Sequence, residues 1–95
     1  MTTAAFPLAP VFPDTTGVNA QQHLTIGGCD VADLAAQYGT PLYVFDETTL
    51  RNQAQSFLKE FGGRYPDVMV AYASKAFISK AIARVFAEEG LGFDV

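Results

Sequence analysis

The chain has 95 residues, of which 49% are hydrophobic and 17% charged, and its formal net charge is -4. This length allows one domain and hardly two, and the apolar content excludes a disordered chain. Six scattered Lys and Arg residues do not form the basic footprint of a nucleic-acid-binding module. Cys29 is the single cysteine, so an intrachain disulfide framework is excluded, which fits a reducing compartment. One cysteine and one histidine, His23, cannot form a zinc cage.

No apolar segment is long enough to cross a membrane, because the longest candidate, residues 68–73, falls far short of the roughly 20 residues that a spanning helix needs. Residues 1–13 are apolar but contain three prolines and no basic region, so we expect no signal peptide. A cytoplasmic protein is therefore expected. The chain stops in an apolar run, residues 90–95, without a following turn, which predicts that it is a piece of a longer protein.

The N-terminal half is punctuated by proline and glycine. Residues 1–22 are predicted to form an extended Pro-rich arm, because proline fixes φ and removes a hydrogen-bond donor. Residues 23–26 predict a short strand that is closed by a glycine pair at 27–28. Asp30 is placed to cap a short helix over 31–38, whose apolar residues follow a helical period.

From residue 42 onward, apolar runs alternate with amphipathic stretches. Three runs are predicted as strands and two stretches as helices, in the order 42–45, 50–61, 68–73, 78–89 and 91–95. The first two strands lack polar alternation, as is typical of strands that are buried on both faces. The β-α-β-α-β order predicts an α/β fold with a parallel sheet or a (β/α) barrel.

The three lysines differ in their predicted positions. Lys59 lies on the polar side of one helix and Lys80 near the start of another, so both are interpreted as surface charges. Lys75 follows the strand predicted over 68–73 by two residues, at the carboxyl end where parallel α/β folds build their sites. Tyr72 and Phe77 offer a setting that desolvates the amine and raises its neutral, nucleophilic fraction. On spacing alone, a structural ion pair and a functional amine remain equal alternatives.

Four further residues carry side chains that could take part in chemistry. Asp94 lies near the end of the strand predicted over 91–95 and would share an edge with Lys75, although the plainer interpretation is an aspartate that caps the next loop. Asp46 is predicted to cap a helix. Cys29 follows two glycines and is interpreted as a packed, inert thiol. His23 has no acid or nucleophile at local spacing and is given no role.

Three motifs resemble those of a known family. Residues 38–46, YGTPLYVFD, resemble the opening segment of diaminopimelate decarboxylases, and residues 71–77, AYASKAF, resemble their lysine-bearing motif. Residues 87–95, AEEGLGFDV, resemble the segment that runs into the second barrel strand. The similarity covers roughly residues 24–95, with Phe77 in place of the commoner Asn. Several motifs in this order are typical of the fold-type III, alanine-racemase-like enzymes that depend on pyridoxal 5′-phosphate (PLP).

The resemblance implies the N-terminal portion of a PLP-binding (β/α)8 TIM barrel, with a leading segment that belongs to a β domain. We expect residues 1–22 to form the arm, residues 23–47 to form the β-domain segment and residues 48–95 to start the barrel. Lys75 matches the lysine that forms a Schiff base with PLP. Asp94 matches an acidic position near the cofactor.

The activity that the resemblance implies is decarboxylation of meso-diaminopimelate to L-lysine and CO2, the last step of lysine biosynthesis, in a cytoplasmic homodimer with no metal ion. The expected binding partner is a small amino-acid substrate. Binding to a nucleic acid or a membrane is not expected. Two alternatives remain: a related decarboxylase of ornithine, arginine or carboxynorspermidine, and a non-catalytic PLP-binding α/β protein. A complete barrel takes about 250 residues. We therefore expect the 95-residue chain alone to be inactive.

Overall fold

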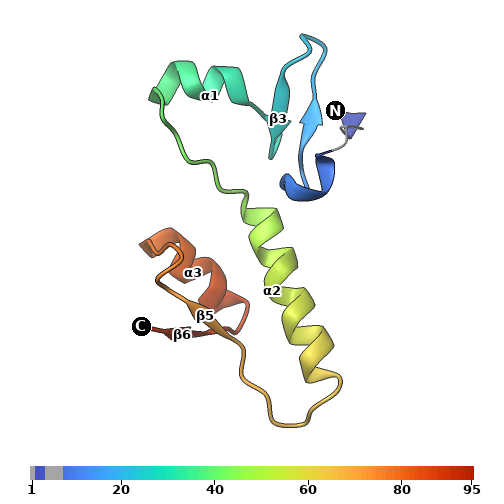
Figure 1. Cartoon of the computed structure of the whole chain (residues 1–95), viewed down its shortest axis with the longest axis vertical. Coiled ribbons are helices and arrows are strands. Elements are labelled where there is room, and N and C mark those ends of the chain that lie inside the picture. Colours follow the sequence, from blue (N-terminus) through green and yellow to red (C-terminus); the bar gives the residue numbers. More distant parts are fainter. Residues whose placement is uncertain (1, 4–7) are drawn as a thin grey trace. The chain divides into compact units, whose positions relative to one another are not determined.

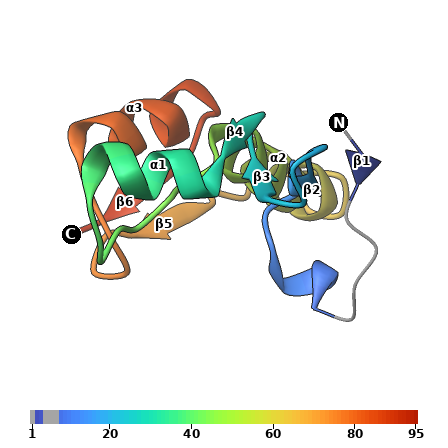
Figure 2. The ribbon, with the colours of Figure 1, turned by 90° about the horizontal axis from the view of Figure 1, so that it is seen from above.

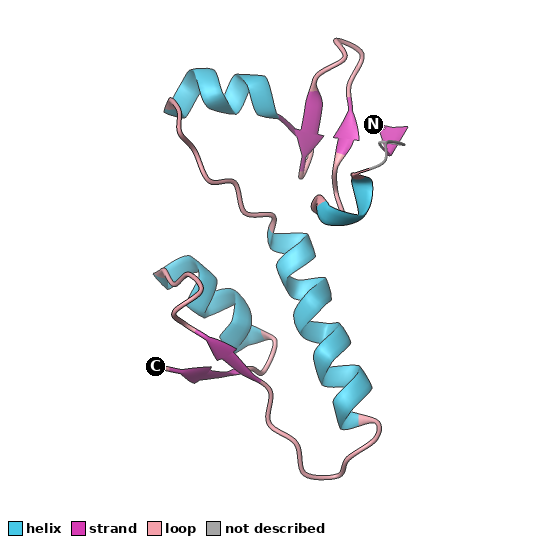
Figure 3. Ribbon diagram, in the orientation of Figure 1, coloured by secondary structure: helices cyan, strands magenta, loops and turns pink. Residues whose placement is uncertain are grey.

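The computed structural model describes residues 2–3 and 8–95, and it is a mixed α/β structure (Figures 1 and 3). Residues 1 and 4–7 of the predicted arm lie outside the described residues. The chain divides into two compact units, Met1–Thr49 and Leu50–Val95, and each is described by itself. Across the described ranges, no helix is long and apolar enough to span a membrane.

The first unit contains a four-stranded antiparallel sheet in the order β1-β2-β3-β4. Its strands are short: β1 (Thr2–Thr3), β2 (Gly17–Val18), β3 (Leu24–Ile26) and β4 (Cys29–Asp30). The predicted Pro-rich arm is therefore partly folded, since β2 and a 3-10 helix, η1 (Ala9–Val11), lie within it. Proline is tolerated in the first turn of a helix, where its missing N–H costs nothing, and η1 has Pro10 in that turn.

A tight hairpin joins β3 to β4 and leads directly into helix α1 (Val31–Tyr38). Ile26 pairs with Cys29, and the two glycines between them have φ values of 60° and 80°. Residues that carry a side chain rarely adopt these backbone angles. The Asp30 carboxylate accepts hydrogen bonds from the first-turn amides of Ala32 and Asp33. The predicted strand, turn and capped helix are confirmed.

Residues 42–45 are not a strand, so this prediction is wrong (Figure 3). The segment belongs to neither described sheet and connects α1 to α2 (Glu47–Gly62). Tyr43 is 87% exposed and Phe45 47% exposed. β-branched and aromatic residues favour a strand because they pack well against neighbours on a sheet. Here neither sheet of the described chain supplies those neighbours, so the local preference alone does not produce a strand.

The second unit contains a parallel pair of strands, β5 (Ala71–Ala73) and β6 (Gly92–Asp94), joined by α3 (Lys80–Glu88). Helix α3 lies on one side of this pair (Figures 1 and 2). The parallel β-α-β arrangement predicted from the alternating pattern is thus confirmed. Both strands are shorter than predicted, and α3 begins later than residue 78. Its start is fixed by Ser79, whose hydroxyl oxygen accepts a hydrogen bond from the Ile82 amide.

A small apolar core joins α2, α3 and the strand pair in the second unit. The buried members are Ala54, Ile82, Val85 and Phe86, with Leu50, Tyr72, Leu91 and Phe93 packed against them. The stripe predicted for the first long helix is only partly covered, because Phe57 and Phe61 of α2 are 51% and 45% exposed. Tyr72 and Phe93 are partners in the parallel register, so both side chains lie on the face that packs against this core.

A charged cluster connects α2 to the C-terminal end of α3. The Arg51 guanidinium donates to Glu88 at 2.7 Å and to Glu89 at 2.8 Å, and the Gln55 amide donates to Glu89 at 2.9 Å. The hydrogen bonds from Gln55 and Arg51 hold the pKa of the Glu89 carboxyl below its usual value. Two glutamates at a helix C-terminus oppose the helix dipole, and Arg51 compensates for them.

Candidate functional site

Lys75 lies in the turn that follows β5, at the carboxyl end of the parallel strand pair. In that pair Ala73 faces Asp94, and both side chains are exposed. Because residues at alternate positions point to opposite faces, Ala73 and Asp94 lie on the face opposite the Tyr72 and Phe93 rings. The structure therefore places both predicted residues, Lys75 and Asp94, at the same end of the strand pair.

The Lys75 side chain is exposed. Within the described part of the chain, no carboxylate lies within ion-pair distance of its amine. Tyr72 and Phe77 were expected to desolvate this amine, but the exposure of Lys75 shows that they do not bury it in this chain. Tyr72 instead turns its ring to the core. The sequence left a structural ion pair and a functional amine as alternatives for Lys75. Among the described residues, Lys75 has no carboxylate partner for the ion pair.

Backbone and side-chain hydrogen bonds fix the turn that carries Lys75. The Ser74 amide donates to the Asp94 carbonyl at 3.2 Å, and the Ala76 amide donates to the Ala73 carbonyl at 3.1 Å. The Tyr72 hydroxyl donates to the Phe77 carbonyl at 2.5 Å. These three bonds lie before, within and after the turn, so its backbone is held although its lysine is exposed.

A cavity of about 300 Å³ lies in the second unit. Its lining is mostly apolar and comes from α2, β5, α3 and the residues directly before β5 and β6: Gln53, Ala54, Phe57, Val70, Ala71, Tyr72, Ala73, Phe86 and Leu91. Neither Lys75 nor Asp94 lines it. Its polar side chains are Gln53 and Tyr72, and the Tyr72 hydroxyl donates to the Phe77 carbonyl, so we assign no acid–base or nucleophilic chemistry to this cavity.

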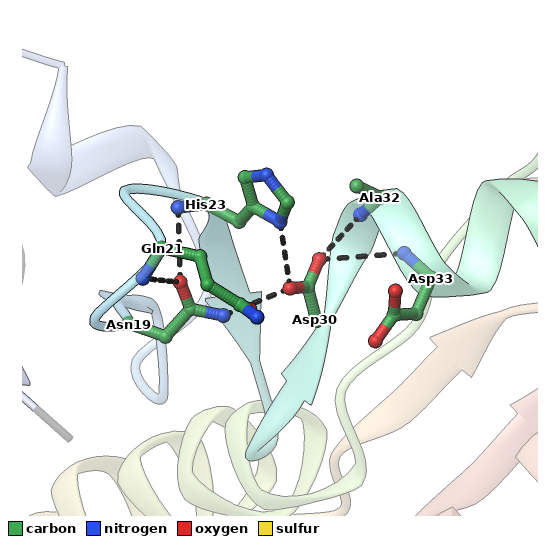
Figure 4. A network of polar contacts seen from close by, with 6 residues as sticks. All are labelled: Asn19, Gln21, His23, Asp30, Ala32 and Asp33. Atoms are coloured by element: carbon green, nitrogen blue, oxygen red, sulfur yellow. Dashed lines mark hydrogen bonds and ion pairs between the residues drawn. The ribbon is translucent and has the colours of Figure 1, made fainter.

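A polar cluster in the first unit was missed by sequence reasoning (Figure 4). Asp30 accepts hydrogen bonds from His23 Nδ1 and Asn19 Nδ2, each at 2.8 Å. Asn19 in turn accepts from the amides of Gln21 and His23. A usable signal was present: Thr25 faces Asp30 across the hairpin, and His23 is two residues from Thr25 on the same face.

The surroundings of Asp30 shift its acidity. Partial burial acts to raise the pKa of this carboxyl, but the hydrogen bonds from His23, Asn19 and the Asp33 and Ala32 amides outweigh it and hold the pKa below its usual value. The Asp30 carboxylate also caps α1, so each of its hydrogen bonds stabilises either the hairpin or the start of the helix. We therefore interpret the cluster as the joint between the hairpin and α1.

The remaining candidates are explained by their positions. Lys59 and Lys80 are exposed. Asp46 accepts a hydrogen bond from the Thr49 amide at 3.1 Å, as expected of a residue that caps α2. Cys29 is exposed on β4, so the interpretation of a packed thiol is wrong. The strand is too short and too close to the edge of its sheet to cover it.

Comparison with known proteins adds the family context. No family model matches the chain. Diaminopimelate decarboxylase from Synechocystis sp. is 47% identical over 90 residues, or 94% of this chain. The enzymes of that name from Bacillus methanolicus and Methanothermobacter thermautotrophicus are 48% and 45% identical over 84 residues, or 88% of the chain. The chain is related to diaminopimelate decarboxylases. The resemblance predicted from its motifs is thereby confirmed.

The similarity has a defined extent. The chain spans about a fifth of the length of these diaminopimelate decarboxylases, 19% in each of the three. A match to 94% of a 95-residue chain leaves only a few terminal residues outside it, so the segment that carries Lys75 lies within the aligned region. The turn over residues 74–77 therefore belongs to the region of this chain that aligns with diaminopimelate decarboxylases.

Proposed function

We propose that the chain is the N-terminal part of a PLP-dependent enzyme that decarboxylates meso-diaminopimelate to L-lysine and CO2. The observation that carries this proposal is Lys75, an exposed amine on a fixed turn at the carboxyl end of a parallel strand. In parallel α/β folds, this is the end where catalytic groups gather. The similarity to diaminopimelate decarboxylases supports the choice of substrate.

We infer that β5, α3 and β6 form the first β-α-β unit of an alanine-racemase-like (β/α)8 barrel that begins near residue 48. Residues 23–47 then form the leading segment of a β domain, after an N-terminal arm over 1–22. The parallel register of β5 and β6 supports the barrel assignment. The antiparallel sheet of the first unit supports the assignment of a separate β segment.

PLP requires a lysine amine that is accessible and not held in an ion pair, and Lys75 fits this requirement. When bound, PLP supplies an aldehyde that condenses with an amine as water leaves, and a ring that accepts the electron pair left by departing CO2. Lys75 would hold the cofactor. Its amine, once released, would be placed to move a proton at the substrate α carbon.

Asp94 is the second residue that we assign to the cofactor site. It ends the neighbouring strand, and its side chain is exposed on the face away from the core. A carboxylate at this edge accepts hydrogen bonds from cationic or N–H groups of a ligand. We further infer a homodimer with a small amino-acid substrate, located in the cytoplasm, by the same family resemblance.

The test is an activity assay on the full-length protein. CO2 release and L-lysine formation are measured from meso-diaminopimelate with and without added PLP, with ornithine, arginine and carboxynorspermidine in parallel. Turnover of meso-diaminopimelate that depends on PLP supports the proposal. Turnover of another substrate identifies a related decarboxylase instead. Cofactor binding without any CO2 release identifies a non-catalytic PLP-binding protein.

A further inference from the structure

We propose that Tyr72 is a positioning residue for Lys75, because its hydroxyl ties the turn over residues 74–77 to the core of the second unit. The proposal rests on the proposed function, in which Lys75 carries the cofactor. It concerns a different atom, the Tyr72 hydroxyl oxygen, and a property that can be measured without the cofactor, the order of the turn.

The hydrogen bond from Tyr72 closes a loop around Lys75. The donor belongs to the middle residue of β5, and the acceptor is the Phe77 carbonyl, five residues later. Lys75 lies between them, in the part of the chain that has left the strand but has not yet entered α3. A bond that spans a turn in this way restricts the backbone on both sides of the residue at its centre.

The other end of Tyr72 is anchored. Its ring centroid lies 4.5 Å from that of Phe86, which is 6% exposed, and 6.5 Å from that of Phe93 in an edge-on arrangement. Aromatic pairs of this geometry add to the stabilisation that comes from burial. The ring is therefore held in place by α3 and β6. Through its hydrogen bond to the Phe77 carbonyl, the hydroxyl restrains the backbone that follows Lys75.

A fixed turn matters for an exposed lysine. The long, unbranched lysine side chain has many rotamers, and ordering it for reaction costs conformational entropy. When the backbone that carries it is already ordered, only the side chain remains to be placed. The geometry assigns this preorganisation to Tyr72, together with the Ser74 and Ala76 amide bonds.

The experiment compares Tyr72→Phe with wild type in the full-length protein. This substitution removes the hydroxyl and keeps the ring in its contacts with Phe86 and Phe93. Tyr65→Phe is the matched control, because Tyr65 is 58% exposed in the loop after α2. The first measurement is amide hydrogen exchange of residues 74–77 and of α3 in protein free of PLP. The second is the rate of Schiff-base formation with PLP, followed by borohydride reduction and peptide mapping.

In Tyr72→Phe, we expect the amides of residues 74–77 to exchange roughly fivefold faster while those of α3 stay unchanged. Schiff-base formation is expected to slow by a similar factor, with the label still on Lys75. Tyr65→Phe is expected to match wild type in both measurements. Unchanged exchange and rate in Tyr72→Phe would overturn the proposal, and so would equal acceleration in α3, because the hydroxyl would then act on overall stability.

The two proposals fail in different ways. A pyridoxyl label on a lysine other than Lys75 would contradict the proposal that Lys75 holds the cofactor. In that case the exchange measurement still decides whether Tyr72 orders the turn. A label on Lys75 with no effect of Tyr72→Phe leaves the proposed function in place and removes the positioning role.

Discussion

The Ser74 amide donates a hydrogen bond to the Asp94 carbonyl oxygen over 3.2 Å, directly before Lys75. This bond continues the parallel pairing of β5 with β6, in which Ala73 faces Asp94. The turn that carries Lys75 is therefore attached to the end of the neighbouring strand. Any change that separates the two strands also releases this turn.

The first prediction concerns the lysine that holds the cofactor. In the PLP-loaded full-length protein, borohydride reduction and peptide mapping are expected to find the pyridoxyl group on Lys75 and not on Lys59 or Lys80. Lys75→Ala is expected to abolish decarboxylation with little change in the unfolding midpoint, because the side chain is exposed and has no ion-pair partner among the described residues. Lys59→Ala is the control and should retain activity. A pyridoxyl group on either other lysine would contradict the assignment.

The second prediction concerns the start of α3. Ser79→Ala removes the hydroxyl that accepts the Ile82 amide, and we expect a loss of about 1 kcal/mol in the free energy of unfolding. Urea denaturation of the full-length protein measures this loss. Ser56→Ala is the control, because Ser56 is exposed in the interior of α2, where alanine is the better helix former. Equal effects of the two substitutions would show that Ser79 does not act as a cap.

The third prediction concerns the contact between α2 and α3. In the full-length protein, Arg51→Ala is expected to lower the unfolding midpoint by roughly 2–4 °C, because it leaves Glu88 and Glu89 without their guanidinium partner. The difference should shrink at high salt, which screens the charges. Arg64→Ala is the control: its side chain is 76% exposed, its distance to Glu60 is 3.8 Å, and no measurable change is expected. A salt-independent loss in Arg51→Ala would point to packing instead of charge.

The fourth prediction concerns pH and the joint between the hairpin and α1. The pKa of Asp30 is lower in the folded chain than in the unfolded one, so the unfolded state takes up the proton first as pH falls. Its contribution to stability is therefore complete above the usual aspartate pKa of about 3.9 and is lost as pH falls through the lowered value. Amide exchange of α1 is expected to accelerate across this acidic range in wild type.

Two variants test the assignment of this pH dependence to Asp30. Asp30→Asn is expected to accelerate exchange in α1 at neutral pH and to flatten its dependence on acid. Asp33→Asn is the control, because Asp33 lies in the same first turn and its amide, not its carboxylate, bonds to Asp30 (Figure 4). If Asp33→Asn flattens the profile as much as Asp30→Asn does, the acid response does not come from the cap.

Features that depend on a few adjacent residues could be predicted from the sequence. The cap at Asp30 and the turn at residues 27–28 need only one carboxylate and two glycines in the right places. The order of β5, α3 and β6 could be predicted as well, because buried strands and an amphipathic helix have different periods. The position of Lys75 after β5 follows directly from that order.

Features that depend on distant neighbours could not be predicted in the same way. Residues 42–45 have strand-like composition but no pairing strand, and the stripe on α2 predicted Phe57 as a core residue although it is half exposed. The bond from Tyr72 to the Phe77 carbonyl depends on a ring position that is set by α3 and β6. The contact of His23 with Asp30 is an intermediate case: the glycine turn signals the hairpin register that brings them together, but a search for acids at local spacing does not use that register.

The last prediction concerns the 95-residue chain produced by itself. Among the described residues, the buried hydrophobic side chains are few, namely Ala54, Ile82, Val85 and Phe86, and none of them is fully buried. Large apolar side chains elsewhere are open to solvent, among them Tyr43, Met69 and Phe57. Each large apolar side chain that is buried contributes about 1.5–3 kcal/mol to stability. A core this small therefore offsets little of the conformational entropy that is lost on folding.

We therefore expect the isolated chain to aggregate, to unfold without a cooperative transition and to release no CO2 from meso-diaminopimelate with added PLP. Light scattering, thermal denaturation followed by circular dichroism, and the CO2 assay measure these three properties. The full-length protein, purified in the same buffer, is the control and should show a cooperative transition and turnover. A cooperative transition together with turnover in the isolated chain would contradict both this prediction and the proposal that residues 48–95 are only the start of a barrel.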